Sequence, residues 1–202
     1  MDGALSGSDH DDETFAALSA AGATVDDVRF AGCRFVECDL SEAVLRSCDF
    51  DDCVFTGCSL SVARVPLSRF CDVTFSGCKM TGVDFAEADW SARAAAAPLR
   101  FDGCGLDLAV FLGLALRAVV FRDCSLRDAD FSDADLTEAD FAGSDLTGAR
   151  FSRTTLTAAR LEAARGYDID LRHNDVRRMV VSLPEAASLL GSLGVELVEP
   201  PG

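Results

Sequence analysis

Cysteine is the residue type of this chain with the widest chemical range, because thiolates bind metals, attack electrophiles and form disulfides. The sequence contains nine cysteines. No two of them have the short C-x-x-C spacing that zinc sites usually use, and an odd number cannot be paired completely into disulfides. All except Cys71 fall into one regular spacing, at positions Cys33, Cys38, Cys48, Cys53, Cys58, Cys78, Cys104 and Cys124. That spacing favours small buried side chains over metal or redox chemistry.

The two histidines are the other candidate catalytic groups. His10 lies in an N-terminal segment that we expect to be a tail, and His173 lies in a late, irregular part of the chain. Neither position offers a serine or cysteine nucleophile together with a base and a residue that orients the base. We therefore expect no enzyme activity, no metal site and no cofactor.

The spacing of the cysteines is part of a five-residue repeat that covers most of the chain. Every fifth residue is large and apolar in two long runs, which are separated by a shift of one position. The residue two places before each of these is usually Cys, Ala or Ser. The large residues are Phe30, Phe35, Leu40, Leu45, Phe50, Phe55, Leu60, Val65, Phe70, Phe75, Met80, Phe85 and Trp90, then Phe101, Leu106, Phe111, Leu116, Phe121, Leu126, Phe131, Leu136, Phe141, Leu146, Phe151, Leu156 and Leu161.

A five-residue period suits neither regular secondary structure. Each repeat would rotate a side chain by about 140° on a helix, and odd spacing alternates the faces of a straight strand. The chain must therefore turn at every repeat. Turns of about 90° close a square coil after four repeats, and about seven coils stacked at about 4.8 Å give a rod about 35 Å long. The small residues then point inward together with the large ones.

The composition restricts the partners of such a rod. With 34 acidic and 18 basic residues, the chain has a formal net charge of -16, which repels nucleic acid and anionic membranes at long range. We expect neither as a direct partner, and we expect a protein partner to be basic. The first residues, MDGALSGSDHDDE, lack the basic and apolar regions of a signal peptide, and no apolar run is long enough to cross a membrane. We expect a cytoplasmic protein.

Acidic residues form a belt between positions 123 and 145, where Arg127 is the single base. The belt consists of Asp123, Asp128, Asp130, Asp133, Asp135, Glu138, Asp140 and Asp145. A second group lies on the side that carries Phe50, Phe70 and Trp90, and consists of Asp49, Asp51, Asp52, Asp72 and Asp89. Carboxylates held at regular intervals along a rod have the electrostatic character of duplex nucleic acid. A solvated surface that prevents aggregation is the alternative, and charge alone supports both equally.

The repeat divides the chain into three segments. Residues 1–24 are expected to form a tail or a cap, with a short helix over residues 14–21, and residues 25–181 form the rod. Within the rod, residues 91–100 contain a register slip, because Trp90 and Phe101 are eleven residues apart where ten would keep the period. The slip is either a one-residue bulge or a small projecting loop.

Residues 182–202 follow the rod and have a different pattern. Ser182 can cap a helix that starts near Pro184, and Gly194 can end it before a short Val-Glu-Leu-Val segment. Such a short helix is stable only when it is packed. It either plugs the end of its own rod or pairs with a second copy about a two-fold axis.

The repeat, (Ala/Cys)-(Asp/Asn)-(Leu/Phe)-(Ser/Thr)-X, resembles that of the pentapeptide-repeat family, as in ADFSDADLTEADFAGSDLTGARF from Ala129 to Phe151. The resemblance covers about residues 30–181. It implies an all-β fold, a right-handed quadrilateral β-helix, here with a short C-terminal helix. As an indicator of function it is weak, because this family contains many members of unknown role.

The C-terminal segment is more informative. A repeat rod followed by an Ala-x-Leu-Leu-x-x-Leu-Gly-Val helix and strand is similar to the Qnr and MfpA type of pentapeptide-repeat protein. That resemblance implies a homodimer through the C-terminal module. It also implies a DNA mimic that binds DNA gyrase or topoisomerase IV through the acidic belt, and protects the enzyme from quinolones or a natural gyrase poison. The residues that would form the dimer contact are Leu189, Leu190, Leu193, Val195 and Leu197. A structural scaffold or interaction module without a topoisomerase target is the alternative.

Overall fold

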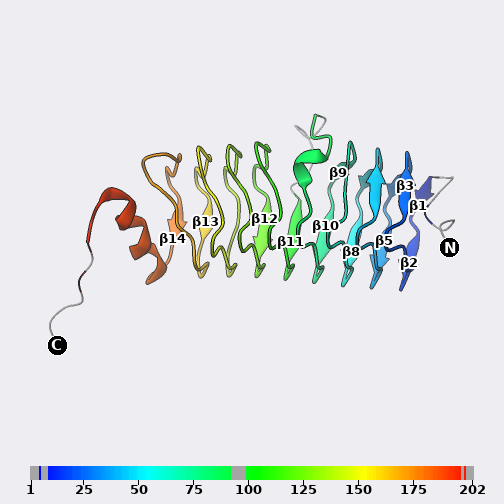
Figure 1. Cartoon of the computed structure of the whole chain (residues 1–202), viewed down its shortest axis with the longest axis horizontal. Coiled ribbons are helices and arrows are strands. Elements are labelled where there is room, and N and C mark those ends of the chain that lie inside the picture. The colour runs from blue at the N-terminus through cyan, green and yellow to red at the C-terminus, as the bar shows by residue number, and fades with distance from the viewer. Residues whose placement is uncertain (1–4, 6–8, 92–98, 197, 199–202) are drawn as a thin grey trace.

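The computed structural model describes Leu5, residues 9–91, residues 99–196 and Val198. The chain forms a rod of stacked coils with a helical segment at its C-terminal end (Figure 1). All strand pairs are parallel, and most strands have only two or three residues. The strands are β1 (His10–Asp11), β2 (Thr14–Ala16), β3 (Thr24–Asp26), β4 (Arg29–Ala31), β5 (Arg34–Val36), β6 (Val44–Arg46), β7 (Asp49–Asp51), β8 (Val54–Thr56), β9 (Arg69–Cys71), β10 (Thr74–Ser76), β11 (Arg100–Asp102), β12 (Val120–Arg122), β13 (Arg160–Leu161) and β14 (Val180–Val181).

The pairing register confirms a four-sided coil of twenty residues. Phe35 of β5 pairs with Phe55 of β8, and Phe30 of β4 pairs with Phe50 of β7. Because consecutive large residues lie on consecutive sides, the rod has four sides, which we name the Phe30, Phe35, Leu40 and Leu45 sides. On each side, the inward residues of successive coils form a column along the rod. The residues directly before and after each inward residue point outward, and the corner lies two residues after it.

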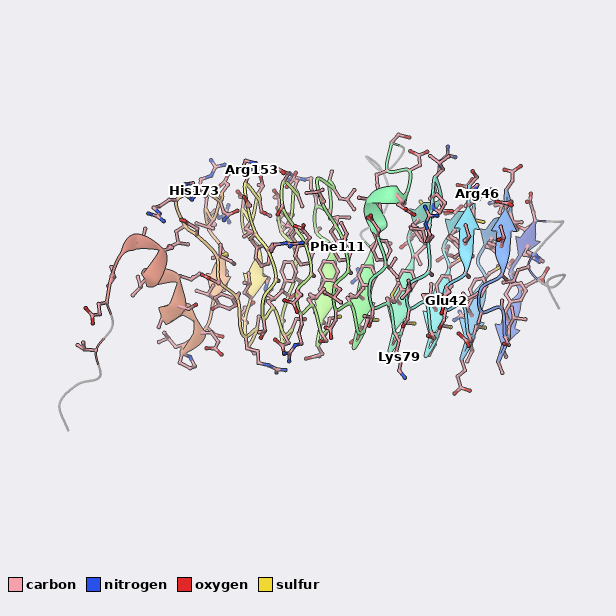
Figure 2. The ribbon with its side chains drawn as sticks, viewed as in Figure 1. Glu42, Arg46, Lys79, Phe111, Arg153 and His173 are labelled. Atoms are coloured by element: carbon pink, nitrogen blue, oxygen red, sulfur yellow. The ribbon has the colours of Figure 1, made fainter. Side chains whose placement is uncertain are left out.

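The column on the Phe35 side shows the length of the rod. It has nine rungs and therefore eight coils, one more than the sequence suggested. The rungs are Phe15, Phe35, Phe55, Phe75, Phe101, Phe121, Phe141, Leu161 and Val181. Most of its aromatic rings stack face to face, with the centroids of Phe35 and Phe55 4.4 Å apart. These rings and the small inward residues fill one continuous core, to which Phe111 also belongs (Figure 2).

The regular coil begins at His10, within the segment for which the sequence suggested a tail or cap. The imidazole of His10 takes the place of a large apolar residue and stacks on Phe30, with ring centroids 5.2 Å apart. The short helix expected over residues 14–21 is wrong, because β2 pairs with β5 there and a turn follows. An aromatic heterocycle can fill a rung as well as phenylalanine does, and a search for apolar residues misses it.

The register slip is larger than a one-residue bulge. Phe75 pairs with Phe101, 26 residues away, whereas regular pairs are 20 residues apart, so this coil is longer by 26 - 20 = 6 residues. Trp90 stacks on Phe70, and Phe101 lies on the adjacent side of the rod. The one-residue bulge was wrong because an insertion of six looks like one repeat plus one residue. Residues 92–98 lie outside the described part of the chain.

The inward small residues determine how most corners turn. Where the small residue of the next coil is alanine, the turn closes with a backbone hydrogen bond, such as the 3.1 Å bond from Ala43 N–H to Leu40 C=O. Where it is serine, the hydroxyl lies between the N–H and C=O groups of the turn and forms a hydrogen bond with each. Cys48 N–H donates to Ser68 Oγ at 2.9 Å, and Ser68 Oγ donates to Leu45 C=O at 2.8 Å. The side chain thus replaces the turn hydrogen bond and keeps the turn open.

The buried cysteines have the same role as Ser68. The thiol of Cys53 donates to Phe30 C=O at 3.3 Å, and the thiol of Cys58 donates to Phe35 C=O at the same distance. Burial raises the pKa of Cys53 to about 12, so this thiol is protonated and can donate at neutral pH. The turn after Phe50 is open although Val73 above it cannot donate, and the turn after Phe131 is closed although the hydroxyl of Thr154 above it donates to Phe131 C=O at 2.9 Å. We have no physical account of these two exceptions. The prediction of structural cysteines is consistent with these contacts.

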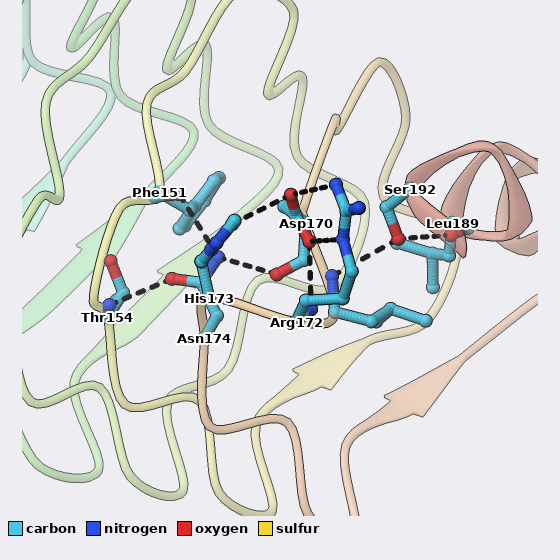
Figure 3. A network of polar contacts seen from close by, with 9 residues as sticks. Phe151, Thr154, Asp170, Arg172, His173, Asn174, Leu189 and Ser192 are labelled. Atoms are coloured by element: carbon cyan, nitrogen blue, oxygen red, sulfur yellow. Dashed lines mark hydrogen bonds and ion pairs between the residues drawn. The ribbon is translucent and has the colours of Figure 1, made fainter. Parts of the chain in front are cut away.

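The helical segment η3 (Glu185–Leu193) covers the last coil (Figure 1). It is a 3-10 helix that ends at Gly194, whose φ of 75° is left-handed as expected for a C-cap. The predicted cap by Ser182 is wrong, because its hydroxyl accepts from Ala163 N–H of the rod. Leu171 N–H donates to Ser192 Oγ at 3.2 Å, and Ser192 Oγ donates to Leu189 C=O at 2.8 Å (Figure 3). The segment therefore supplies hydrogen-bond partners to the open end of the rod.

We predict that Cys53→Ala and Cys53→Ser have different effects on stability. Alanine removes the thiol that donates to Phe30 C=O, and the turn between Phe30 and Cys33 must rearrange to replace this donor, which should lower the free energy of unfolding by about 1–3 kcal/mol. Serine keeps a donor, as Ser68 does at the equivalent position, and should cost less than half as much. Urea unfolding of both variants measures the difference. Equal losses would show that thiol volume, and not hydrogen bonding, matters at this position.

Candidate functional site

The acidic belt surrounds the rod instead of forming one face. Asp130, Asp135, Asp140 and Asp145 precede four consecutive inward residues, so each lies on a different side. One carboxylate oxygen of each accepts a hydrogen bond from the backbone N–H two residues later, at 3.0 to 3.1 Å. Asp140 and Asp145 are buried and the other two are half-buried. These four carboxylates therefore stabilise the turns, as Asp commonly does.

Arginines of the neighbouring coils neutralise much of the belt. The other carboxylate oxygen of Asp140 accepts from two guanidinium nitrogens of Arg122, at 2.8 and 2.6 Å. The carboxylate of Asp145 lies 3.1 Å from the guanidinium of Arg165. Three further pairs are Arg150–Asp130, Arg117–Asp135 and Arg153–Asp133. Along the sequence Arg127 is the single base of the belt, but the coil brings in bases from about 20 residues away on both sides.

These contacts change the acidity of the belt. The hydroxyl and backbone N–H of Thr147, with the guanidinium of Arg165, hold the pKa of the Asp145 carboxyl below its usual value against the effect of burial. For Asp130, partial burial is the largest effect and alone would raise the pKa. The hydrogen bonds from Ser132 and the charge of Arg150 outweigh it, so this pKa is also lowered.

Three members of the belt have a different environment, at the corners of the rod. Asp123, Asp128 and Glu138 are exposed and make no ion pair with another described residue. Their φ angles are 51°, 57° and 62°, in the left-handed region that the corner of the coil requires. Asp tolerates this conformation better than most residues. The belt thus separates into turn-forming carboxylates and solvated corner carboxylates, and the solvated ones are available to a partner.

The second acidic group lies on the first five rungs of the Phe30 side. Aspartates alternate there with two arginines, so that Arg69 lies 3.6 Å from Asp49 and 2.9 Å from Asp89. Hydrogen bonds from Ser91, together with Arg69, lower the pKa of Asp89 to about 2. Eight carboxylates surround Arg29 and Arg69 on this side and its following corner, and these are Asp9, Asp11, Asp12, Asp49, Asp51, Asp52, Asp72 and Asp89.

The first five rungs of the Phe30 side, with the corner that follows them, therefore keep a net charge of -6, from eight carboxylates and two arginines. That corner carries Asp12, Asp52 and Asp72, and Glu138 continues the same corner further along the rod. The longer coil gains its six residues at this corner, between Trp90 and Phe101. Sequence reasoning found both acidic groups, but it ranked the belt first because it could not see the arginines of adjacent coils.

The expected dimer residues divide into two sets. Leu189 is buried in the core of its own rod, so the helix has the plugging role that was one of the two alternatives. Leu190, Leu193 and Val195 are exposed, with 37%, 52% and 46% of their surface accessible. Leu197 lies outside the described residues. The exposed apolar surface at this end also includes Leu183 and Val198.

Other kinds of site find little support in the described part of the chain. No group of three or more His, Cys, Asp or Glu side chains there could hold a metal ion. None of the helices that the structure describes is long and apolar enough to span a bilayer. His173 is exposed, and its Nδ1 lies 2.9 Å from Asp170 next to the C-terminal helix (Figure 3).

Comparison with known proteins identifies the repeat. The family model "Pentapeptide repeat region" matches residues 28–111, and "Pentapeptide repeats (8 copies)" matches residues 115–153 and 124–162. No curated protein is recognisably similar to the chain in sequence.

Two solved structures show similar rods. Trypsin-treated QnrB1, a plasmid-mediated fluoroquinolone resistance protein, is 21% identical with a TM-score of 0.55, covering 97% of this chain and 100% of its own. HetL, involved in heterocyst differentiation regulation in the cyanobacterium Nostoc, is 18% identical with a TM-score of 0.48, covering 87% and 88%. At these identities the likeness to QnrB1 concerns the fold alone.

The ion-paired belt should make the rod sensitive to acid. The pKa values of Asp130, Asp133, Asp135 and Asp145 are lowered in the folded chain. Their stabilisation is therefore complete above the unfolded pKa of about 4 and is lost as the pH falls through the folded values. We expect the urea midpoint to be level from pH 7 to 5 and to drop below about pH 4.

Two variants test whether the acid dependence arises from the turn-forming carboxylates of the belt. Asp145→Asn keeps an acceptor for Thr147 N–H but loses the titratable charge, so it should flatten the acid dependence. Asp128→Asn, at a solvated corner, should leave the dependence as it is in the parent chain. Equal flattening by both variants would contradict the distinction between turn-forming and corner carboxylates.

Proposed function

The chain belongs to the pentapeptide-repeat family, and on that premise we propose that it is a non-enzymatic, DNA-mimicking rod that binds a type II topoisomerase. The partner is DNA gyrase or topoisomerase IV, and binding protects it from quinolones or from a natural gyrase poison. The binding surface consists of the Phe30 side and the corner carboxylates Asp123, Asp128 and Glu138. The turn-forming carboxylates of the belt hold the rod in shape.

The observation that carries this proposal is the density of charge along the rod. Residues 9–181 contain 30 acidic and 18 basic residues, a net charge of -12. Over eight coils, a length of about 38 Å at about 4.8 Å per coil, this is roughly one negative charge per 3.2 Å. Duplex DNA has about one per 1.7 Å. A rigid rod with about half the charge density of DNA can enter a basic groove that is built for DNA, and long-range attraction increases the rate of association.

The fold is consistent with the same proposal, but it is not the main evidence for it. QnrB1, whose rod is similar, is a fluoroquinolone resistance protein. Quinolones act on type II topoisomerases, so a similar acidic rod is a reasonable ligand for such an enzyme. The proposal depends on the charge pattern of this chain, because a shared coil at 21% identity says nothing about which side chains contact a partner.

We also propose that two rods associate through their C-terminal ends. Leu189 closes the core of each rod, while Leu190, Leu193 and Val195 remain exposed next to Leu183. Apolar side chains grouped at one end favour an isologous contact between two copies. A dimer would double the length of the charged rod, and this suits a partner that binds a long DNA segment.

Neutralising the solvated carboxylates should weaken topoisomerase binding without unfolding the rod. We suggest Asp52→Asn, Asp72→Asn, Asp123→Asn and Asp128→Asn together, because Asn tolerates the left-handed conformation of these corners. The control is Asp130→Asn, Asp135→Asn, Asp140→Asn and Asp145→Asn together, which removes the same number of charges from turn-forming positions. Supercoiling by gyrase with and without a fluoroquinolone, and the affinity for gyrase at low salt, measure the effect.

We expect the corner variant to bind at least tenfold more weakly and to lose protection. The control should lose stability first and bind nearly normally when folded. If the parent protein neither binds gyrase nor alters supercoiling at micromolar concentration, the topoisomerase proposal is wrong. In that case a scaffold or interaction module with another target remains.

The dimer has its own test by sedimentation. Leu193→Arg places a charge in the exposed apolar surface and should convert a dimer into a monomer, while Leu189 still closes the core. Ala17→Arg, at an exposed corner of the first coil, is the matched control and should leave the mass unchanged. A monomeric parent chain at all concentrations would contradict the dimer.

A further inference from the structure

Large exposed apolar residues occur in two places among the described residues. One group is the C-terminal end, and the other is in the middle of the rod. The middle group consists of Val62, Leu67, Leu108 and Leu112, with 60%, 65%, 57% and 46% of their surface exposed. Neither the core nor the proposed dimer uses this group. It needs a separate explanation, since isolated exposed residues are ordinary but a cluster is not.

The register brings the middle group together on the Leu45 side. Val62 N–H bonds to Thr81 C=O, and Gly82 N–H bonds to Asp107 C=O, so Val62, Gly82 and Leu108 follow one another on the corner before this side. At about 4.8 Å per coil, Val62 and Leu108 are about 10 Å apart. Gly82 between them has no side chain, and a Cβ there would meet nothing within 4 Å. The two apolar side chains thus stand on either side of a gap.

One of the two outward columns of the Leu45 side adds further apolar residues, Pro66, Ala86 and Leu112 in three successive coils, and Leu67 lies at the opposite corner. The other column carries Arg64 and Asp84, and the carboxylate of Asp84 accepts from Ala86 N–H at 2.8 Å. We call the combination the corner patch, and it consists of Val62, Pro66, Leu67, Ala86, Leu108 and Leu112. Arg64 crosses it but is paired with Glu87 at 2.9 Å.

Three members of the corner patch are in an unfavourable conformation. Val62, Leu67 and Leu108 have φ angles of 58°, 60° and 61°. This left-handed region disfavours side chains with a Cβ, and β-branched valine most of all. Elsewhere the same corner position is occupied mainly by Gly, Ala, Asp and Glu. Large apolar residues there add backbone strain and expose apolar surface, so they do not serve the stability of the rod. An outlier of this kind points to a function.

The surroundings of the corner patch indicate what can cover it. Acidic residues lie on the same two corners. Glu42 and Asp128 are one coil away from Val62 and Leu108, whereas Asp27 and Asp133 are two or more coils away from Leu67, and Asp133 is paired with Arg153. A second copy would bring a like-charged border against this one, which disfavours self-association. A groove of about 340 Å³, lined by Asp27, Ser47, Asp49, Leu67, Arg69 and Asp89, connects the corner patch to the acidic Phe30 side. The chemistry therefore suits a partner with an apolar projection flanked by basic residues.

We propose that the corner patch is a contact surface for such a basic partner, where apolar burial adds short-range affinity to the long-range attraction of the carboxylates. This inference rests on the proposed function, which makes the topoisomerase the partner. The Phe30 side and the corner patch then form one continuous interface through the groove at Leu67. Binding through charges alone would disappear in high salt, whereas binding through the corner patch persists.

The test removes the corner patch without disturbing the coil. Val62→Asn, Leu67→Asn and Leu108→Asn together replace strained apolar residues with one that tolerates the left-handed region. The matched control is Ala17→Asn, Gly77→Asn and Ala163→Asn, at corners with φ of 50°, 60° and 57° outside the patch. Affinity for purified gyrase is measured at 0.1 and about 0.5 M salt, with the melting temperature of each protein.

We expect the patch variant to melt at the same or a higher temperature and to bind gyrase at least tenfold more weakly, with the larger loss at high salt. The control should bind as the parent does. Equal binding by parent and patch variant overturns this inference and leaves the topoisomerase proposal intact. Failure of the parent to bind gyrase overturns both.

Two further results would also overturn the inference. A clear fall in the melting temperature of the patch variant would show that these residues serve the fold. A loss of dimer in the patch variant, with the dimer intact in Leu193→Arg, would show that a second copy covers the corner patch.

Discussion

Parallel backbone pairing between residues twenty apart is the constraint on which the rest of the structure depends. It requires each coil to close in four turns, and this places every large residue directly above one of the same kind, as Phe55 lies above Phe35. The inward positions are then restricted in size. The position two places before each large residue usually takes Cys, Ala or Ser, although Leu99 and Leu114 are buried exceptions. A stacked coil also leaves open backbone edges only at its ends, and the segment around Ser192 covers one of them.

The small inward residues also control the turns. An alanine allows the turn below it to close, while a thiol or hydroxyl enters the turn and bridges its two backbone groups, as Ser68 does between Leu45 and Cys48. Whether an inward small residue is cysteine or alanine therefore indicates whether the turn below it is open or closed. This explains why a chain with nine cysteines can be rich in thiols for a reason unrelated to redox chemistry. The high pKa that burial gives Cys53 and Cys48 keeps these thiols as donors.

A rod of this kind presents side chains at fixed intervals, so its surface is determined by which outward positions the fold itself needs. Carboxylates that accept the next turn's N–H, such as Asp140, belong to the fold and are paired with arginines. Corner positions are needed only for their left-handed backbone, and their side chains are free to serve a partner. Asp128 and Leu108 show the two uses, one charged and one apolar, at equivalent corners. The partner contacts that we propose for this chain therefore lie at corners and in outward columns, while the inward columns specify the shape.

The sequence by itself determined the coil, because a five-residue period with alternating large and small residues has only one packed solution. It also identified the acidic residues, the place of the interruption and the C-terminal helix. It could not rank the acidic residues, since Arg122 and Arg165 reach Asp140 and Asp145 only after twenty residues have closed a coil. The sequence did not indicate that His10 belongs to the rod, because a stacked imidazole has no apolar pattern. It also underestimated the length of the insertion, because six residues look like one five-residue repeat plus a shift of one position. Only the structure showed that Leu189 is buried while Leu190 and Leu193 are exposed. Periodicity along the chain shows which residues point inward, and only the stacked coils show which outward residues meet.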